Sequence, residues 1–327
     1  LCISGGCAFN SVLNGKIVKE TSFKKILSSQ NVGDAGGAVG SALYTAMTHK
    51  EKINRSSSLY LGTKYNNDYV EKKIVSKLLN NKSYRIKYYE NFIELCDEVA
   101  KEISEKKIIG WYQDEMEWGP RALGNRSIIA DPRHEDIRDL INLKIKLREE
   151  FRPFAPAVLK ENANEYFEIS QSSDYMGFVF DAKEKARQKI PAVVHIDNTS
   201  RVQTVSLETN KKFYNLIKSF SNITSVPVLL NTSLNVNEPI CEKPEDAINV
   251  FTSTSMDMMV IQNWKGGGDM YFEQLIHFGT HCSLKNINNM FSKMVSKSTS
   301  NCITYLHNLI FFISIQIIII WKTLNSL

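Results

Sequence analysis

Three polar segments of this 327-residue sequence carry residue types suited to binding phosphate groups. The richest spans residues 116–127 and contains Arg121 and Arg126, with Asn125 and Ser127 as neutral donors. Guanidinium groups are permanently charged and offer paired donors that match phosphate oxygens. Two glycines and a proline punctuate the segment, which indicates a shaped loop rather than a helix. A surface loop with two solvated arginines is the alternative interpretation.

The second segment spans residues 144–156 and concentrates positive charge. Four basic residues fall within nine positions, before two prolines that stop a helix: Lys144, Lys146, Arg148 and Arg152. Lys146 and Arg148 are two positions apart, so they do not share a helix face. They would converge on one ligand only if the helix ends near them. A solvated helix face is the alternative.

The third segment follows a strand-like apolar run at residues 226–230. It brings four polar residues to the carboxyl end of that strand: Asn231, Thr232, Ser233 and Asn235. Ligands of α/β sheets gather at such strand ends, and these side chains can hydrogen-bond a base, ribose or phosphate. An ordinary polar turn is the alternative.

The sequence gives little indication of a metal site. Asp34 lies among four small residues, where a carboxylate could serve a hard metal or a phosphate-bound magnesium ion, or equally cap a helix. Of the six histidines, only His277 and His281 have helical spacing. The six cysteines form no CxxC pair, so neither a zinc nor a disulfide framework is indicated, and a reducing, cytoplasmic setting fits best.

Composition is that of a folded protein of about two domains, with 43% apolar and 23% charged residues. The net charge of +5 suits acidic small molecules such as nucleotides and is too weak to argue for nucleic acid. The apolar run at residues 309–321 is shorter than the roughly 20 residues that span a bilayer, so we do not expect a membrane protein. The chain opens without Met inside a strand-like stretch, which indicates a fragment.

Alternating helical and strand-like patterns predict an α/β domain at residues 69–263. Helices are expected at residues 69–79, 92–103, 135–147, 211–220 and 244–251, and strands at 84–89, 108–112, 176–180, 202–205, 226–230 and 258–261. Residues 1–60 read as the end of another domain, in which small residues from Ala38 open a close-packed helix. From residue 265, a glycine breaker at 266–268 begins an atypical tail, 265–327.

The stretch MEWGPRALGNRSIIADPR closely resembles a motif of the O-carbamoyltransferases, the family of nodulation protein U and tobramycin carbamoyltransferase. Other matching stretches follow in the family's order: FRPFAPAVL, SRVQTV, PVLLNTSLNVNEPI and PEDAINVF. SGGCAFNSVLNGKI and GDAGGAVGSAL resemble the close of the family's actin-like domain. The resemblance covers about residues 1–263. It implies a YrdC-like mixed-sheet α/β domain preceded by the C-terminal remnant of an actin-like domain.

The resemblance also implies roles for the polar segments. Lys146, Arg148 and Arg152 before a proline resemble the basic motif of YrdC-like proteins. Residues 232–235 resemble their Thr-Ser-Ala-Asn motif, with leucine in place of alanine. Phosphate and carbamoyl binding then belong to Arg121, Arg126, Lys146, Arg148 and Arg152. Nucleotide binding belongs to Asn125, Ser127, Asn231, Thr232, Ser233 and Asn235.

The implied activity is ATP-dependent O-carbamoyl transfer. Carbamoyl phosphate and ATP, with Mg²⁺, would give carbamoyl adenylate and pyrophosphate, and the carbamoyl group would pass to the hydroxyl of a small-molecule acceptor. Asp34 matches a metal-binding aspartate for Fe²⁺ or another divalent metal of the complete family protein, but the family's His-x-x-x-His motif is absent from this sequence. Two other interpretations stay open: a basic nucleic-acid-binding module of YrdC-like fold, and a non-catalytic fragment.

Overall fold

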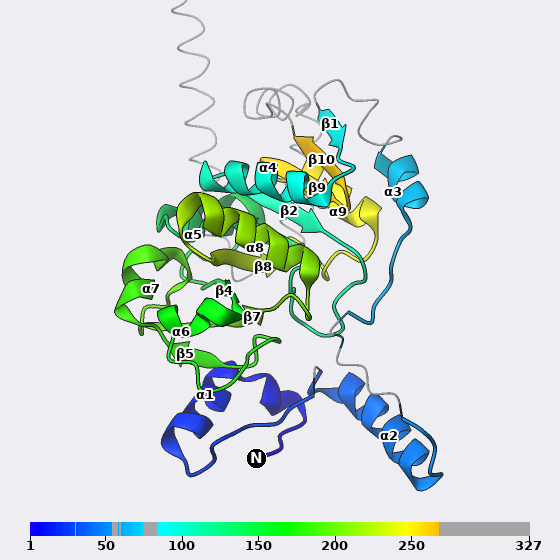
Figure 1. Cartoon of the computed structure of the whole chain (residues 1–327), viewed down its shortest axis with the longest axis vertical. Helices are drawn as coiled ribbons and strands as arrows, with labels where there is room; N and C mark the ends of the chain where they lie inside the picture. Colours follow the sequence, from blue (N-terminus) through cyan, green and yellow to red (C-terminus); the bar gives the residue numbers. More distant parts are fainter. Residues whose placement is uncertain (30, 54–57, 59, 75–83, 268–327) are drawn as a thin grey trace, which may run out of the picture. The chain divides into compact units, whose positions relative to one another are not determined.

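The computed structural model describes residues 1–29, 31–53, 58, 60–74 and 84–267 (Figure 1). Leu1–Met270 forms one compact unit, and the remainder of the chain lies outside the described residues. No helix in the described part is long and apolar enough to cross a membrane. The apolar run at 309–321 and the pair His277 and His281 cannot be placed, because they lie outside the described ranges.

A mixed sheet of eight strands forms the centre of the unit, in the order β1-β10-β9-β2-β3-β8-β4-β7. Two neighbouring pairs, β2–β9 and β4–β7, are parallel, and the others that the structure describes are antiparallel. The mixed-sheet α/β prediction is therefore confirmed. The strands are β1 Arg85–Tyr88, β2 Ile109–Tyr112, β3 Arg126–Ala130, β4 Ala155–Leu159, β7 Gln203–Val205, β8 Val228–Ser233, β9 Met258–Ile261 and β10 Trp264–Gly267. A second sheet pairs β5 Val179–Asp181 with β6 Thr199–Arg201.

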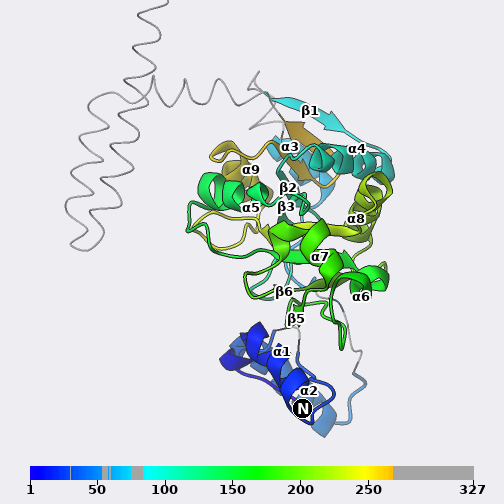
Figure 2. The ribbon, with the colours of Figure 1, turned by 90° about the vertical axis from the view of Figure 1, so that its left-hand side faces the viewer.

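Two amphipathic helices, α4 (Phe92–Ser104) and α8 (Lys211–Thr224), pack together on one side of the large sheet. Figure 2 shows α5 (Asp136–Ile141) and α9 (Pro244–Thr252) on the other side. In α4 and α8 the apolar side chains recur at helical spacing and are buried: Leu95, Val99 and Ile103, and Phe213, Leu216, Ile217 and Phe220. Asn91 and Asn210 cap the two helices by accepting hydrogen bonds from the main-chain N–H groups of Ile93 and Phe213.

The remaining described helices are α1 Ser11–Glu20, α2 Asp34–Thr48, α3 Asn67–Ile74, α6 Ala163–Tyr166 and α7 Glu184–Lys189. Short turns of other helical types are η1 Gly6–Phe9, η3 Asn142–Lys146, η4 Lys160–Asn162 and η5 Pro191–Val193. The structure describes no buried residue in α2, so the expectation of a close-packed helix there was wrong.

Several element boundaries differ from those expected from the sequence. β3 begins at Arg126, inside the segment that we interpreted as a loop, and β4 begins at Ala155, between the two prolines of the basic segment. Neither strand was predicted, because β3 lies next to a glycine-rich motif and β4 contains Pro156. Gly266 and Gly267 do not break the structure, because they complete β10 between β9 and β1. The helix expected at 135–147 ends as the wider turn η3.

The N-terminal residues contact the segment around β5. Asn14 Nδ2 donates to the carbonyl oxygen of Gly177 at 2.9 Å, and Gln171 exchanges two hydrogen bonds with the main chain of Ile26. Lys19 pairs with Asp181 at 2.6 Å. The division into domains at 1–60 and 69–263 stays a prediction.

Candidate anion site

The end of the α5–η3 helix positions Lys146. The helix closes as a π turn at Lys146, and Leu147 takes a left-handed conformation, φ 49°, which turns the chain so that Lys146 and Arg148 separate. Lys146 is 2% exposed. Its Nζ donates to the carbonyl oxygen of Ser233, to Ser233 Oγ at 3.2 Å, and to the carbonyl oxygen and Oδ1 of Asn235 at 2.9 and 2.8 Å. The second and third polar segments therefore meet at one ammonium group.

Burial, and next the positive charge of Arg148, lower the pKa of Lys146 to about 7. The oxygen acceptors around Nζ work in the opposite direction, because they stabilise the charged form. Burial and next Arg152 also lower the pKa of Arg148, whose Nε donates to Asn142 Oδ1 at 2.7 Å.

Arg121 and Arg148 lie close enough to Arg201 for their charges to act on it, and Arg148 also acts on Lys146. We call Arg121, Arg148 and Arg201 the arginine cluster. Burial, and next the positive charges of Arg121 and Arg148, lower the pKa of Arg201 to about 10. Burial also lowers the pKa of Arg121. Among the described residues, no carboxylate lies within ion-pair distance of any of the three. Partly buried, mutually repelling cations without a counter-charge favour the binding of an anion.

Arg201 was not selected from the sequence. It is the last residue of β6, and its Nε is buried without a hydrogen-bond partner in the described part of the chain. It stands in the SRVQTV stretch, where a single arginine before a short alternating strand shows no chemical pattern. Only its placement beside Arg121 and Arg148 marks it as a candidate anion ligand.

Two predicted phosphate ligands lie in different surroundings. The guanidinium of Arg126 is fully buried above the ring of Tyr112, at 3.6 Å from the ring centre. It donates to the main-chain carbonyl oxygens of Gln113, Asn125, Asp114 and Thr63. These contacts favour a structural role. Arg152 is exposed and pairs with Glu149 at 2.9 Å. The phosphate-binding roles of Arg126 and Arg152 stay predictions.

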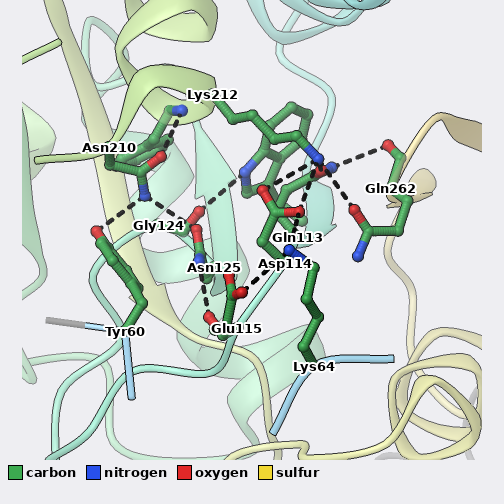
Figure 3. Close-up of polar contacts among 12 residues, drawn as sticks. Tyr60, Lys64, Gln113, Asp114, Glu115, Gly124, Asn125, Asn210, Lys212 and Gln262 are labelled. Atoms are coloured by element: carbon green, nitrogen blue, oxygen red, sulfur yellow. Dashed lines mark hydrogen bonds and ion pairs between the residues drawn. The ribbon is translucent and has the colours of Figure 1, made fainter. Parts of the chain in front are cut away.

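The predicted nucleotide ligands divide into two groups. Ser233 and Asn235 lie beside Lys146, and Ser233 Oγ donates to Asn235 Oδ1 at 2.7 Å. The other four predicted ligands make contacts within the protein. Asn125 accepts from Asn210 at 2.9 Å and donates to the carbonyl oxygen of Glu115, contacts that Figure 3 shows.

Within this second group, Ser127 Oγ accepts from the N–H of Gly124 at 3.1 Å, and Asn231 Nδ2 donates to Gln203 at 2.8 Å. Thr232 is paired in β8 opposite Ile128. For these four residues, Asn125, Ser127, Asn231 and Thr232, nucleotide contact stays a prediction.

Asp34 lies in the first turn of α2, with an exposed side chain. In the described ranges, no three His, Cys, Asp or Glu side chains are grouped as a metal site. The role of Asp34 as a metal ligand therefore stays a prediction.

A second polar cluster that the sequence did not reveal joins α8 to the ends of β2 and β9. Lys212 Nζ donates to Gln113 Oε1 at 3.1 Å and Gln262 Oε1 at 3.0 Å, and it pairs with Asp114 at 3.1 Å (Figure 3). Gln113 and Gln262 directly follow neighbouring parallel strands. The cluster thus fixes the start of the β2–β3 connection that carries Arg121.

Comparisons with known proteins point to one family along most of the chain. Residues 100–265, more than half of the chain, match the family described as "Carbamoyltransferase C-terminus". Residues 1–43 match the family described as "Carbamoyltransferase N-terminus".

Among curated proteins, the chain is 39% identical over 81% of its length to an uncharacterized protein of Synechocystis sp. and, with the same two values, to nodulation protein NolNO of Sinorhizobium fredii. Nodulation protein U of Rhizobium fredii is 30% identical over 72% of the chain. The alignments cover 47%, 39% and 38% of these proteins, so the chain spans less than half the length of each. Among solved structures, full-length HypF in its phosphate- and nucleotide-bound form has a TM-score of 0.38 at 16% identity, covering 55% of this chain and 22% of that one.

Proposed function

Because the chain belongs to the carbamoyltransferase family, we propose that its α/β unit binds ATP and carbamoyl phosphate at the arginine cluster and forms carbamoyl adenylate. Family membership supports the transfer of carbamoyl groups as the reaction of the whole protein. The nucleotide, the adenylate intermediate and the acceptor are our proposal. We also propose that the reaction takes place in the cytoplasm, where both anionic substrates would be available.

The proposed reaction has two steps. Water attacks the carbonyl carbon of carbamoyl phosphate, and the bond from this carbon to the oxygen of the phosphate group breaks. The products are carbamate and phosphate. A carbamate oxygen then attacks the α-phosphorus of ATP, and the bond to the leaving pyrophosphate breaks. Negative charge accumulates on the phosphoryl oxygens during the attack, and fixed cations stabilise it.

The observation that carries the proposal is the arginine cluster next to the Lys146–Ser233–Asn235 network. Two anionic ligands at one site require several cations close together. Arg121, Arg148 and Arg201 meet this requirement, and none of them is within ion-pair distance of a described carboxylate. Lys146 would take part as the fourth cation. Ser233 and Asn235 orient its ammonium and offer hydroxyl and amide groups to the nucleotide.

Magnesium would enter as the counter-ion of ATP. Proteins usually hold Mg²⁺ through one or two carboxylates and the phosphates of the substrate. The described residues supply no cage for a transition metal either, because Asp34 has no grouped partners there. We therefore derive no step through Fe²⁺ or another resident metal. Transfer of the carbamoyl group to an acceptor hydroxyl is proposed for the family protein as a whole.

The test is carbamoyl-phosphate-dependent exchange of labelled pyrophosphate into ATP, which requires no acceptor. We expect exchange by the chain and its loss in Arg148→Ala. Arg85→Ala is the matched control, because Arg85 is exposed on β1, at the opposite end of the sheet from β4 and β7. Equal activity of the two variants would disprove the proposed site. ATP binding without exchange in the unchanged chain would disprove the proposed chemistry.

A further inference from the structure

Side chains hold the main chain at the end of the loop that carries Arg121, although residues 118–124 form neither helix nor strand. The carbonyl oxygen of Leu123 accepts from Tyr60 Oη at 3.0 Å and Gln203 Nε2 at 2.8 Å. The carbonyl oxygen of Gly124 accepts from Trp111 Nε1 at 3.0 Å, and that of Ala122 accepts from a side-chain amide. These contacts restrict the conformations open to the end of the loop.

Three N–H groups at and just after the end of this loop converge on one carboxylate oxygen. Glu117 Oε1 accepts from the N–H of Leu123 at 2.7 Å, of Asn125 at 2.7 Å and of Arg126 at 3.1 Å. Hydrogen bonds to an ionised acceptor are about twice as strong as neutral ones. Glu117 is 4% exposed, so little water competes for its oxygen. The carboxylate therefore joins the start of the loop to its end.

The loop also fits closely against α8. Gly124 has φ 107°, and a Cβ at this position would lie 2.3 Å from the ring of Phe213. In the sequence, Arg121 lies between Glu117 and the three residues whose N–H groups donate to Glu117. Closure of the loop therefore restrains the main chain that carries Arg121, whose side chain has no ion-pair partner among the described residues.

We propose that Glu117 is a positioning residue of the anion site: it closes the loop 118–124 and thereby holds Arg121 in place to bind an anion. The proposal rests on the anion site of the proposed function, but not on the reaction that the site performs. A positioning residue acts only through the group that it positions. Its removal should have no effect once Arg121 itself is gone.

The experiment is a double-mutant cycle of Glu117→Gln and Arg121→Ala, with inorganic pyrophosphate as the probe and calorimetry as the measurement. We expect each single variant to bind pyrophosphate about tenfold or more weakly, the loss of one charged hydrogen bond to an anion. The double variant should bind no more than about twofold more weakly than Arg121→Ala. If the double variant loses affinity by the product of the two single losses, the proposal is overturned. Unchanged pyrophosphate binding in Glu117→Gln would also overturn it.

Hydrogen–deuterium exchange tests the contacts directly and guards against a simple folding defect. Peptides covering 118–126 should exchange faster in Glu117→Gln than in the unchanged chain, while α4 and α8 stay protected. Glu115→Gln is the matched control, because this carboxylate lies two residues away and pairs with Lys64 at 3.0 Å instead of with the loop. Unchanged exchange of the loop in Glu117→Gln would overturn the proposal.

Should Glu117→Gln fail to fold, Tyr60→Phe replaces it. This variant removes one of two bonds to the carbonyl oxygen of Leu123, so we expect a smaller loss of affinity that again vanishes with Arg121→Ala. A non-additive cycle in a chain without pyrophosphate–ATP exchange would support Glu117 and refute the proposed reaction. Pyrophosphate–ATP exchange together with an additive cycle would support the proposed reaction and refute the role of Glu117. If the unchanged chain does not bind pyrophosphate, both the reaction and the role of Glu117 are refuted.

Discussion

Lys146 Nζ lies 2.8 Å from Oδ1 of Asn235, although the two residues are 89 positions apart in the sequence. The contact joins the end of a helix to the second residue after strand β8. It depends on the left-handed residue Leu147, which lets the chain turn away immediately after Lys146. The basic segment can therefore place one cation against β8 and the next, Arg148, in the arginine cluster.

Replacement of Arg201 should separate affinity from stability. Arg201→Met removes a buried cation that Arg121 and Arg148 repel, but it keeps most of the side-chain volume. Pyrophosphate affinity should fall about ten- to a hundredfold. The melting temperature should stay the same or rise, since sites built for ligands are commonly destabilising. Calorimetry and thermal unfolding check this, with Arg85→Met as control. A clear drop in melting temperature would show that the fold needs the charge of Arg201.

Anion binding should weaken as pH rises above about 7. Lys146 has a folded pKa lowered to about 7 from 10.5, so it is charged below that pH and neutral above it. A bound anion favours the charged form, so binding above pH 7 takes up a proton. Subtracting the profile of Lys146→Met from that of the unchanged chain removes the titration of pyrophosphate itself. Identical profiles for the two proteins would contradict this assignment.

The same pKa difference affects folding. Between about pH 7 and 10.5 the unfolded chain holds a proton on Lys146 that the folded chain lacks. The contribution of Lys146 to the free energy of unfolding should therefore rise with pH across this window. Denaturant unfolding of the chain and of Lys146→Met at several pH values measures the difference.

Acid should weaken the attachment of β10. Burial raises the pKa of Glu98, but hydrogen bonds from Lys265 and Tyr89 outweigh it and lower the pKa to about 2, below its usual 4.5. A lowered carboxylate pKa stabilises the fold above pH 4.5, and the effect is lost as pH falls toward 2. In acid unfolding curves, Lys265→Met should lose less stability than the unchanged chain as pH falls from about 4.5 toward 2. Lys19→Met, which breaks the exposed pair with Asp181, should leave the curve unchanged.

Truncation tests the same strand. A chain that ends at Asn263 lacks β10, which pairs with both β9 and β1, and it should melt below a chain that ends at Gly267. Equal melting temperatures would mean that β10 adds nothing to the sheet.

Gly124→Ala should destabilise the protein by about 1–3 kcal/mol, because φ 107° is strained for any side chain and the new methyl group would meet Phe213. Gly37→Ala is the control. Gly37 is exposed within α2, with nothing within 4 Å of the added carbon, so it should be neutral or stabilising by about 0.5–1 kcal/mol. Denaturant midpoints compare the two. A loss in Gly124→Ala no larger than in Gly37→Ala would contradict the argument.

The sequence predicted the amphipathic helices α4, α8 and α9 because their buried residues repeat at helical spacing. It did not predict β3, whose five buried residues include Arg126 and Ser127. Burial of a guanidinium is possible there only because four main-chain carbonyl groups surround it, and three of these come from the β2–β3 connection while one comes from Thr63. No local pattern contains that information.

Because local patterns do not contain long-range contacts, the sequence predicted only some residues of the anion site. Lys146, Arg148, Ser233 and Asn235 stood out because basic and polar residues clustered in the sequence. Arg201 and Glu117 did not, because one is a single arginine beside a strand and the other a single glutamate beside a more conspicuous motif. Their roles come from approach in three dimensions: a cation against two others, and a carboxylate against three N–H groups.

The pairing of residues 60–63 with the start of the arginine loop has a mechanical consequence. Gly62 donates to the carbonyl oxygen of Met116 at 3.0 Å, Met116 donates to that of Thr63 at 3.2 Å, and Arg126 also reaches Thr63. The backbone entering the α/β unit is thus fastened to the residue next to Glu117. A displacement of residues 60–63 would therefore act directly on the start of the loop that carries Arg121.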